Sequence, residues 1–133
     1  MCIRDRDKIV HHDDHFYVVD YKTGKYKSEK FREPVNGKKA GDYWRQIVFY
    51  KLLIDADPKF NKAMSYGLID FVEPQDGQYK FKKIEVSQFD YDHVTEELLT
   101  TYKAIQNHEF SEGCGEETCR WCNFVSDHLN AGE

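Results

Sequence analysis

The spacing of hydrophobic and polar positions changes several times along the chain. Residues 8–12, KIVHH, and 15–22, HFYVVDYK, are short apolar runs rich in β-branched and aromatic residues, which predicts two strands. Asp13 and Asp14 separate them, and Asp tolerates the backbone of a tight turn, so we expect a hairpin. Residues 41–57, GDYWRQIVFYKLLIDAD, change to helical spacing. The first half therefore predicts strand, strand and helix.

The second half repeats this order. Residues 63–74 and 77–89 resemble two strands, joined by a turn at 76–77, which reads Asp-Gly. Residues 90–110 have the pattern of an amphipathic helix, with Asp90 as its expected cap. The predicted order is β-β-α-β-β-α, which places the chain in the α/β or α+β class.

Composition favours one folded domain. The chain has 133 residues and a mass of 15.8 kDa, with 40% hydrophobic and 15% aromatic residues, which excludes a disordered chain. No apolar run reaches membrane-spanning length and no signal peptide is present, so we expect a cytoplasmic protein. Segment 1–6, MCIRDR, fits nothing that follows and is read as an artefactual leader before a core over 7–110 and a cysteine-containing tail over 111–133.

Charge is unevenly distributed. The net charge of −5 does not indicate a nucleic-acid-binding protein, but the polar connection between the first hairpin and the first helix is basic. Its positive residues are Lys22, Lys25, Lys27, Lys30, Arg32, Lys38 and Lys39. Such a stretch can follow the phosphates of a nucleic acid, or it can be a solvated lysine-rich loop.

Asp20 and Lys22 are charged residues at the end of an apolar strand, and they are candidates for a catalytic site. Residues two apart on a strand share a face. A hairpin centred between 13 and 14 pairs residues whose numbers sum to 27, which places Asp7 opposite Asp20. Two opposed carboxylates, with Cβ atoms about 5 Å apart, repel each other unless a cation such as Mg²⁺ lies between them. The alternative is a pair of exposed hairpin charges, and a slip of one residue would separate them.

The motif VVDYKTGK, with an upstream aspartate and a following QIVFY, resembles the RecB-like nuclease branch of the PD-(D/E)XK superfamily. That branch has an acidic residue in a strand, then D-x-K after a hairpin, then a helix with Q-x-x-x-Y. The matching residues here are Asp7, Asp20, Lys22, Gln46 and Tyr50. The resemblance implies a restriction-endonuclease-like mixed sheet flanked by helices, with the first helix and its histidine ligand missing from this chain.

The resemblance also implies a function, a metal-dependent deoxyribonuclease that hydrolyses phosphodiester bonds at single-stranded DNA ends. Asp7, Asp20 and the backbone carbonyl of Tyr21 would hold Mg²⁺ or Mn²⁺. Lys22 would orient the attacking water, and the helix motif would line the site. Such domains lie at the C-terminus of UvrD/Rep-type helicase–nucleases that process double-strand breaks.

The basic connection would then guide the substrate. The residues expected to contact single-stranded DNA are Lys25, Lys27, Lys30 and Arg32. The alternative function is a non-catalytic nuclease-fold module that binds DNA or docks a helicase partner, with a structural metal at the cysteine tail.

The tail holds Cys114, Cys119 and Cys122, with His128 six residues after the last cysteine. Close thiolates suit Zn²⁺ or an iron–sulfur cluster. Several RecB-like nucleases resemble this arrangement, using three C-terminal cysteines and an earlier one to hold a [4Fe–4S] cluster. Here histidine stands at the position of the last cysteine, and Cys2 lies in the leader. A zinc site with His128, a variant cluster and a remnant of one therefore remain open.

Three histidines, His11, His12 and His15, flank the first turn. They do not share one face of the hairpin, so we interpret them as a polar hairpin tip and not as a metal site.

Overall fold

The computed structural model describes residues 8–11, 14–35, 40–60, 62–109, 113–114 and 116–124. The chain divides into two compact units, Met1–Glu96 and Glu97–Glu133, and each is described by itself. Within the described ranges, no helix combines the length and the apolar character needed to cross a membrane.

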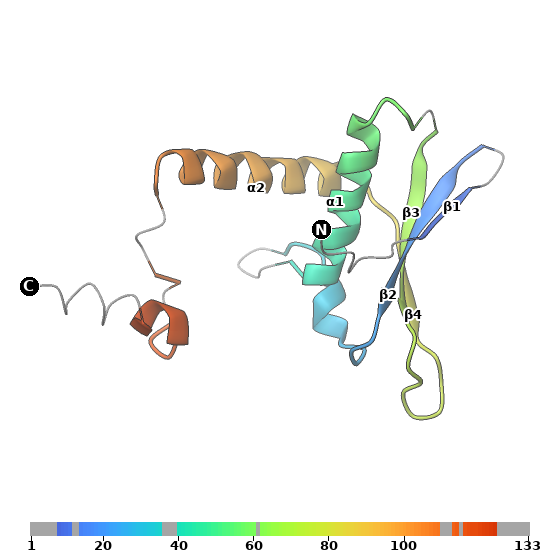
Figure 1. The fold of residues 1–133 in the computed structure, drawn as a ribbon, viewed down its shortest axis with the longest axis horizontal. Coiled ribbons are helices and arrows are strands. Elements are labelled where there is room, and N and C mark those ends of the chain that lie inside the picture. The colour runs from blue at the N-terminus through green and yellow to red at the C-terminus, as the bar shows by residue number, and fades with distance from the viewer. Residues whose placement is uncertain are drawn as a thin grey trace, which may run out of the picture. The chain divides into compact units, whose positions relative to one another are not determined.

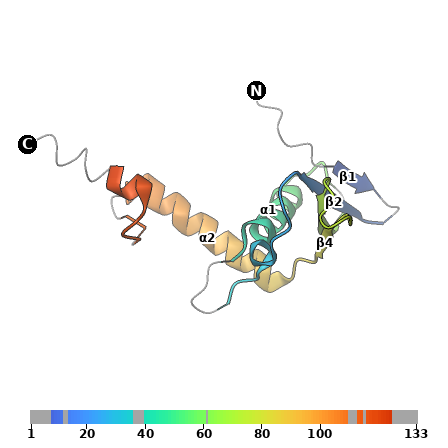
Figure 2. The ribbon, with the colours of Figure 1, turned by 90° about the horizontal axis from the view of Figure 1, so that it is seen from below.

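The first unit is built on a four-stranded mixed sheet. In chain order the elements of the whole chain are β1 (Lys8–His11), β2 (Phe16–Lys22), the 3-10 helix η1 (Ser28–Phe31), α1 (Asp42–Ala56), β3 (Met64–Phe71), β4 (Phe81–Ile84) and α2 (Gln88–Gln106), and the first unit contains α2 only as far as Glu96. The strands lie in the order β1-β2-β3-β4; β2 and β3 are parallel, and the two outer pairs are antiparallel. Helix α1 runs along one face of the sheet (Figures 1 and 2). The predicted α/β class and element order are confirmed, and the mixed sheet with flanking helices is consistent with a restriction-endonuclease-like fold.

The register of the first hairpin is the predicted one. Lys8 pairs with Val19 and His11 with Phe16, so that paired numbers sum to 27. The residue that this register would place opposite Asp20 is Asp7, which lies outside the described residues.

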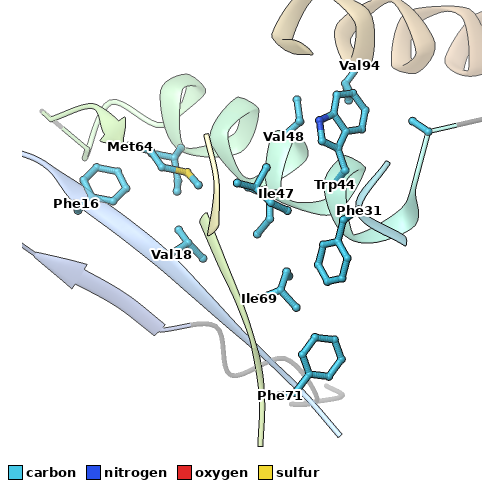
Figure 3. Close-up of a cluster of buried hydrophobic side chains, with 13 residues drawn as sticks. Phe16, Val18, Phe31, Trp44, Ile47, Val48, Met64, Ile69, Phe71 and Val94 are labelled. Atoms are coloured by element: carbon cyan, nitrogen blue, oxygen red, sulfur yellow. The ribbon is translucent and has the colours of Figure 1, made fainter. Parts of the chain in front are cut away.

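The hydrophobic core lies between α1 and one face of the sheet. Figure 3 shows Ile47 of α1 directed toward Ile69 of β3 and Val18 of β2. Gly67 of β3 is required here, because a Cβ atom at this position would lie 2.4 Å from Cγ2 of Ile47. Trp44 is also buried, beside Val94 of α2. Burying one such large side chain contributes roughly 1.5–3 kcal/mol, so this layer fixes α1 on β2 and β3.

The connection before α1 is less polar than expected. It contains η1, whose Phe31 is buried and lies 6.3 Å from Phe71, centroid to centroid. Tyr26 and Phe31 are five residues apart among polar residues, which fits neither the helix nor the strand period, so the sequence pattern did not reveal this burial. The chain returns closely at Gly41, where a Cβ atom would lie 2.2 Å from the carbonyl oxygen of Lys30. This close approach positions η1 against the start of α1.

The second hairpin has the predicted turn but shorter strands. Asp76 and Gly77 have φ angles of 53° and 76°, which a two-residue type I′ turn requires. The strand expected over 77–89 was wrong in extent: β4 covers only Phe81–Ile84, and α2 begins at Gln88.

The predicted cap of α2 was misplaced by three residues. Asp90 lies in the first turn, and Ser87 precedes the helix. The Ser87 hydroxyl oxygen accepts a hydrogen bond from the Asp90 N–H at 3.2 Å, and Asp90 Oδ2 accepts one from the Ser87 N–H at 2.8 Å. This reciprocal pair is a capping box. The helix also ends at Gln106, four residues before the expected end.

Candidate active site

The candidate site is formed where the end of β2 faces α1. Along β2, Phe16, Val18, Asp20 and Lys22 alternate with residues of the opposite face, and the first two belong to the core under α1. The same alternation turns Asp20 and Lys22 toward α1. Asp20 is only 3% exposed, although it carries a carboxylate. A buried charge must be paired and hydrogen-bonded.

The two oxygens of Asp20 have different partners. Oδ1 accepts hydrogen bonds from Gln46 Nε2 at 3.0 Å and from the Tyr50 hydroxyl at 3.1 Å. Oδ2 lies 2.7 Å from Lys22 Nζ, which forms an ion pair with it. Oδ2 is buried and has no hydrogen-bond partner among the residues that the structure describes. It therefore keeps lone pairs for another donor or a cation.

Gln46 links the three other side chains. Its Oε1 accepts a hydrogen bond from Lys22 Nζ at 2.8 Å, and its Nε2 donates to the Tyr50 hydroxyl at 2.6 Å as well as to Asp20. These partners fix the orientation of the amide, because the lysine only donates and the carboxylate only accepts. The spacing of four residues places Gln46 and Tyr50 on one face of α1. The structure thus brings Asp20, Lys22, Gln46 and Tyr50 into one closed network.

Tyr43 belongs to this site and was missed from the sequence. Lys22 Nζ lies 5.0 Å from the centre of the Tyr43 ring, and Lys30 Nζ lies 4.5 Å from it. Lys30 also donates a hydrogen bond to the Tyr43 hydroxyl at 3.2 Å. Helical spacing could have indicated that Tyr43 belongs to the site. Tyr43 precedes Gln46 by three residues and Tyr50 by seven, so all three lie on one face of a helix. The ring holds two ammonium groups near one another by cation–π attraction.

The other residues predicted for this site are placed as follows. Lys25, Lys27 and Arg32 are exposed around η1, whereas Lys30 is half-buried against Tyr43. Tyr21 lies in β2 between the two charged residues, with its side chain on the opposite face from Asp20. Asp7 lies outside the described residues, as do Lys38 and Lys39.

The described residues fit a hard divalent cation. Such ions prefer carboxylate oxygens, and Asp20 offers Oδ2, a buried oxygen without a hydrogen bond within the described part of the chain. The ammonium of Lys22 stands beside the same oxygen and supplies positive charge there. The arrangement therefore places one anionic ligand and one ammonium group at the same point.

The second unit contains a separate cluster of thiols. The Sγ atoms of Cys114, Cys119 and Cys122 all lie within 4.8 Å of one another, and those of Cys114 and Cys122 are 3.6 Å apart. A tetrahedral zinc with Zn–S bonds of about 2.3 Å holds its sulfurs roughly 3.8 Å apart. The three cysteines therefore have the spacing of ligands around one metal ion. His128 and Cys2 lie outside the described residues.

The backbone around the cluster favours a thiolate at one position. Hydrogen bonds from the backbone N–H of Cys122, from the thiols of Cys114 and Cys122 and from the N–H of Trp121 lower the pKa of Cys119 from 9.0 to about 7. At Cys114 the N–H of Glu116 lowers the pKa, but the thiol hydrogen bonds with Cys119 and Cys122 together raise it above 9.0. Cys119 is thus the first of these two to ionise.

Comparison with known proteins agrees with the geometry of the first site. The model of the PD-(D/E)XK nuclease superfamily matches residues 4–126, which is nearly the whole chain. No curated protein and no solved structure gave a match. The match covers β2 with its D-x-K residues and α1 with its glutamine and tyrosine. This chain belongs to the PD-(D/E)XK nuclease superfamily.

Proposed function

We propose that this chain is a metal-dependent deoxyribonuclease of the RecB-like branch, acting on single-stranded DNA ends in the cytoplasm. The observation that carries the proposal is the closed network of Asp20, Lys22, Gln46 and Tyr50. Members of the superfamily typically hydrolyse phosphodiester bonds with divalent metal ions, and the network contains the acidic residue and the lysine that give the superfamily its name.

The residues that would hold the metal are Asp7, Asp20 and the backbone carbonyl of Tyr21. A bound Mg²⁺ or Mn²⁺ supplies positive charge for a phosphate oxygen and lowers the pKa of water. Asp20 offers Oδ2 for this purpose, while Gln46 and Tyr50 hold Oδ1 and so prevent the carboxylate from rotating. The network therefore prepares the ligand before a metal or substrate arrives.

Lys22 would orient the attacking water. An ammonium has three N–H donors, and in the structure Lys22 Nζ faces Asp20 Oδ2 and Gln46 Oε1. Its side chain is 21% exposed, so water and a phosphate can reach it. The remaining N–H suits a water or phosphate oxygen, and the positive charge offsets the charge that develops at the phosphate.

The substrate would pass along the exposed side of the basic connection. Lys25, Lys27 and Arg32 are exposed there, and Lys30 lies beside Tyr43 and Lys22. Contacts with phosphates release counterions, so affinity for single-stranded DNA should fall as salt rises. By resemblance to RecB-like nucleases, the domain would act with a UvrD/Rep-type helicase in the repair of double-strand breaks.

The experiment is cleavage of end-labelled single-stranded DNA with Mg²⁺ or Mn²⁺, compared with EDTA. Asp20→Ala should abolish metal-dependent cleavage and leave DNA binding intact. Asp14→Ala is the matched control, because this aspartate lies in the turn of the same hairpin with its side chain 85% exposed. Cleavage by Asp20→Ala at the wild-type rate would refute the assignment.

A second function is favoured by the cysteine cluster. The sulfur spacing suits Zn²⁺, or the variant iron–sulfur cluster that the RecB-like resemblance implies, as a structural staple in a non-catalytic module that binds DNA or docks a helicase. DNA binding that is indifferent to Asp20 and Lys22, without any cleavage, would favour this module over the enzyme.

A further inference from the structure

Aromatic and basic residues alternate where the chain enters β4. The sequence is Tyr79-Lys80-Phe81-Lys82-Lys83, and we call residues 79–83 the aromatic–lysine strip. Tyr79 is 70% exposed and Phe81 is 67% exposed. A strand that served only the core would turn its aromatic residues inward, as β3 does with Phe71. The strip instead presents two rings to solvent with lysines between them.

The pairing of the strands shows which side each residue faces. Phe81 pairs with Asp70 of β3, and Asp70 pairs with Tyr21 of β2, so Phe81 and Tyr21 share the face opposite α1. Lys80 lies on the other side, with its Nζ 5.8 Å from the centre of the Tyr26 ring. The Phe81 ring therefore lies on the face opposite α1, alternation along the chain would turn Tyr79 toward the same side, and Lys80 lies on the other side.

The strip lies at the same end of the sheet as the candidate active site, with Phe81 on the face opposite the one that carries Asp20 and Lys22. Tyr21 stands between the two charged residues of β2, and the carbonyl of Lys22 accepts a hydrogen bond from the Val72 N–H at 3.1 Å. The loop between β3 and β4 therefore lies at the same end of the sheet as Lys22. Figure 1 shows the end of β2 and the β3–β4 loop at this end. Gln75 Oε1 accepts a hydrogen bond of 2.8 Å from the Tyr26 N–H and ties this hairpin to the chain after β2.

We propose that the aromatic–lysine strip is a second binding surface for single-stranded nucleic acid, next to the catalytic end of the sheet. Bases would stack on Tyr79 and Phe81, and Lys80 and Lys82 would neutralise phosphates. Lys83 contributes less, because its Nζ is paired with Glu85 at 2.6 Å. A duplex keeps its base faces stacked inside, so the surface selects single strands. This inference rests on the proposed nuclease function and names where its substrate is held.

The test is binding of a fluorescein-labelled oligothymidylate, followed by anisotropy in EDTA, where no metal-dependent cleavage occurs. Phe81→Ala and Tyr79→Ala should each weaken binding about five- to a hundredfold, as loss of one stacked base does. Phe89→Ala is the matched control, since Phe89 is also 67% exposed but lies in α2 beside Asp90. It should bind like the wild type.

Two further variants separate base stacking from general apolar contact. Phe81→Tyr keeps an aromatic face and should bind like the wild type, whereas Phe81→Leu should be as weak as Phe81→Ala. Lys82→Gln should reduce the salt dependence of binding by about one phosphate contact, a slope change of roughly 0.7. Circular dichroism of each variant verifies that the fold is retained.

The outcomes distinguish this inference from the proposed function. Equal binding by Phe81→Ala and wild type, or wild-type binding by Phe81→Leu, overturns the strip as a stacking surface, even if the chain cleaves DNA through Lys22. A surface that served only a protein partner would give the first of these results, because DNA binding would then not depend on Phe81. Binding that depends on Phe81 without any metal-dependent cleavage would support the strip and refute the nuclease.

Discussion

The two clusters of reactive side chains in this molecule are built in different ways. The Asp20 site joins β2 and α1, which are far apart in the sequence, and it lies on a core that buries Trp44, Ile47 and Ile69. The cysteine cluster lies within a few residues of the chain, and its neighbours Trp121 and Phe124 are exposed.

This difference indicates where the free energy of each site comes from. Burial of apolar side chains holds the Asp20 network in place without any bound ion. The described residues of the cysteine cluster contribute little buried surface, so their arrangement depends on hydrogen bonds and on whatever the thiolates bind. When a metal binds such a segment, the free energy of binding also stabilises the folded arrangement of the segment. We therefore expect the first site to be formed in advance and the second to be completed by its ligand.

The largest expected effect is that of zinc on the cysteine cluster. Zn²⁺ should bind the reduced protein tightly, since structural zinc sites gain about 10 kcal/mol or more at neutral pH. Cys119→Ser should lose this binding, measured by competition with a colorimetric zinc chelator. Cys2→Ser, at the cysteine that lies far from these three in the sequence, is the control and should bind like the wild type. Unchanged zinc affinity in Cys119→Ser would show that the three thiols do not act together.

The two tryptophans test the contrast in burial directly. Trp44 is 1% exposed and Trp121 is 75% exposed. Trp44→Ala should lower the free energy of unfolding by about 3–5 kcal/mol, whereas Trp121→Ala should change it by less than about 0.5 kcal/mol. Urea denaturation followed by circular dichroism measures both. Similar losses of unfolding free energy in the two variants would contradict the statement that apolar burial stabilises the first region and not the second.

The hydrogen bonds of Gln46 should contribute a smaller amount. Gln46→Met keeps much of the side-chain volume but leaves Asp20 Oδ1 with one donor fewer and removes an acceptor of Lys22. We expect a loss of about 1–3 kcal/mol in the free energy of unfolding, because a buried charged group is left partly unpaired. Gln78→Met, in the exposed turn before β4, is the control. No difference between the two would mean that the network does not stabilise the fold.

The smallest expected effect is a difference in reactivity between two thiols. The pKa of Cys119 is about 7, while that of Cys114 is raised above 9.0. Alkylation by iodoacetamide requires the thiolate, so the rate at Cys119 should level off above about pH 7, whereas the rate at Cys114 should be slower at neutral pH and still rising there. Peptide mass spectrometry over a pH series, with EDTA present, measures both rates. Faster alkylation of Cys114 at neutral pH would contradict the assignment.

Local rules predicted much of the fold and part of the site. The hairpin register followed from the Asp13–Asp14 turn, and the shared faces of Asp20 with Lys22 and of Gln46 with Tyr50 followed from strand and helix periods. The strand limits in the second hairpin were less accurate, because the capping of α2 by Ser87 competes with extension of β4.

Contacts between distant segments could not be predicted in this way. Burial of Phe31 and the place of Tyr43 depend on how η1 folds back onto α1 at Gly41. The approach of Ile47 to Gly67 depends on the parallel pairing of β2 with β3, and no local period specifies that pairing. Phe31 and Tyr43 were missed because their neighbours come from another element.

DNA cleavage by a Lys22→Ala variant shows whether Lys22 and its network are catalytic. Cleavage of labelled single-stranded DNA with Mg²⁺ or Mn²⁺ should be at least about a hundredfold slower in Lys22→Ala than in the wild type, the usual loss when a group that stabilises charge in the transition state is removed. Lys59→Ala, an exposed lysine outside the network, should cleave like the wild type. Equal metal-dependent cleavage by Lys22→Ala and wild type would contradict the claim.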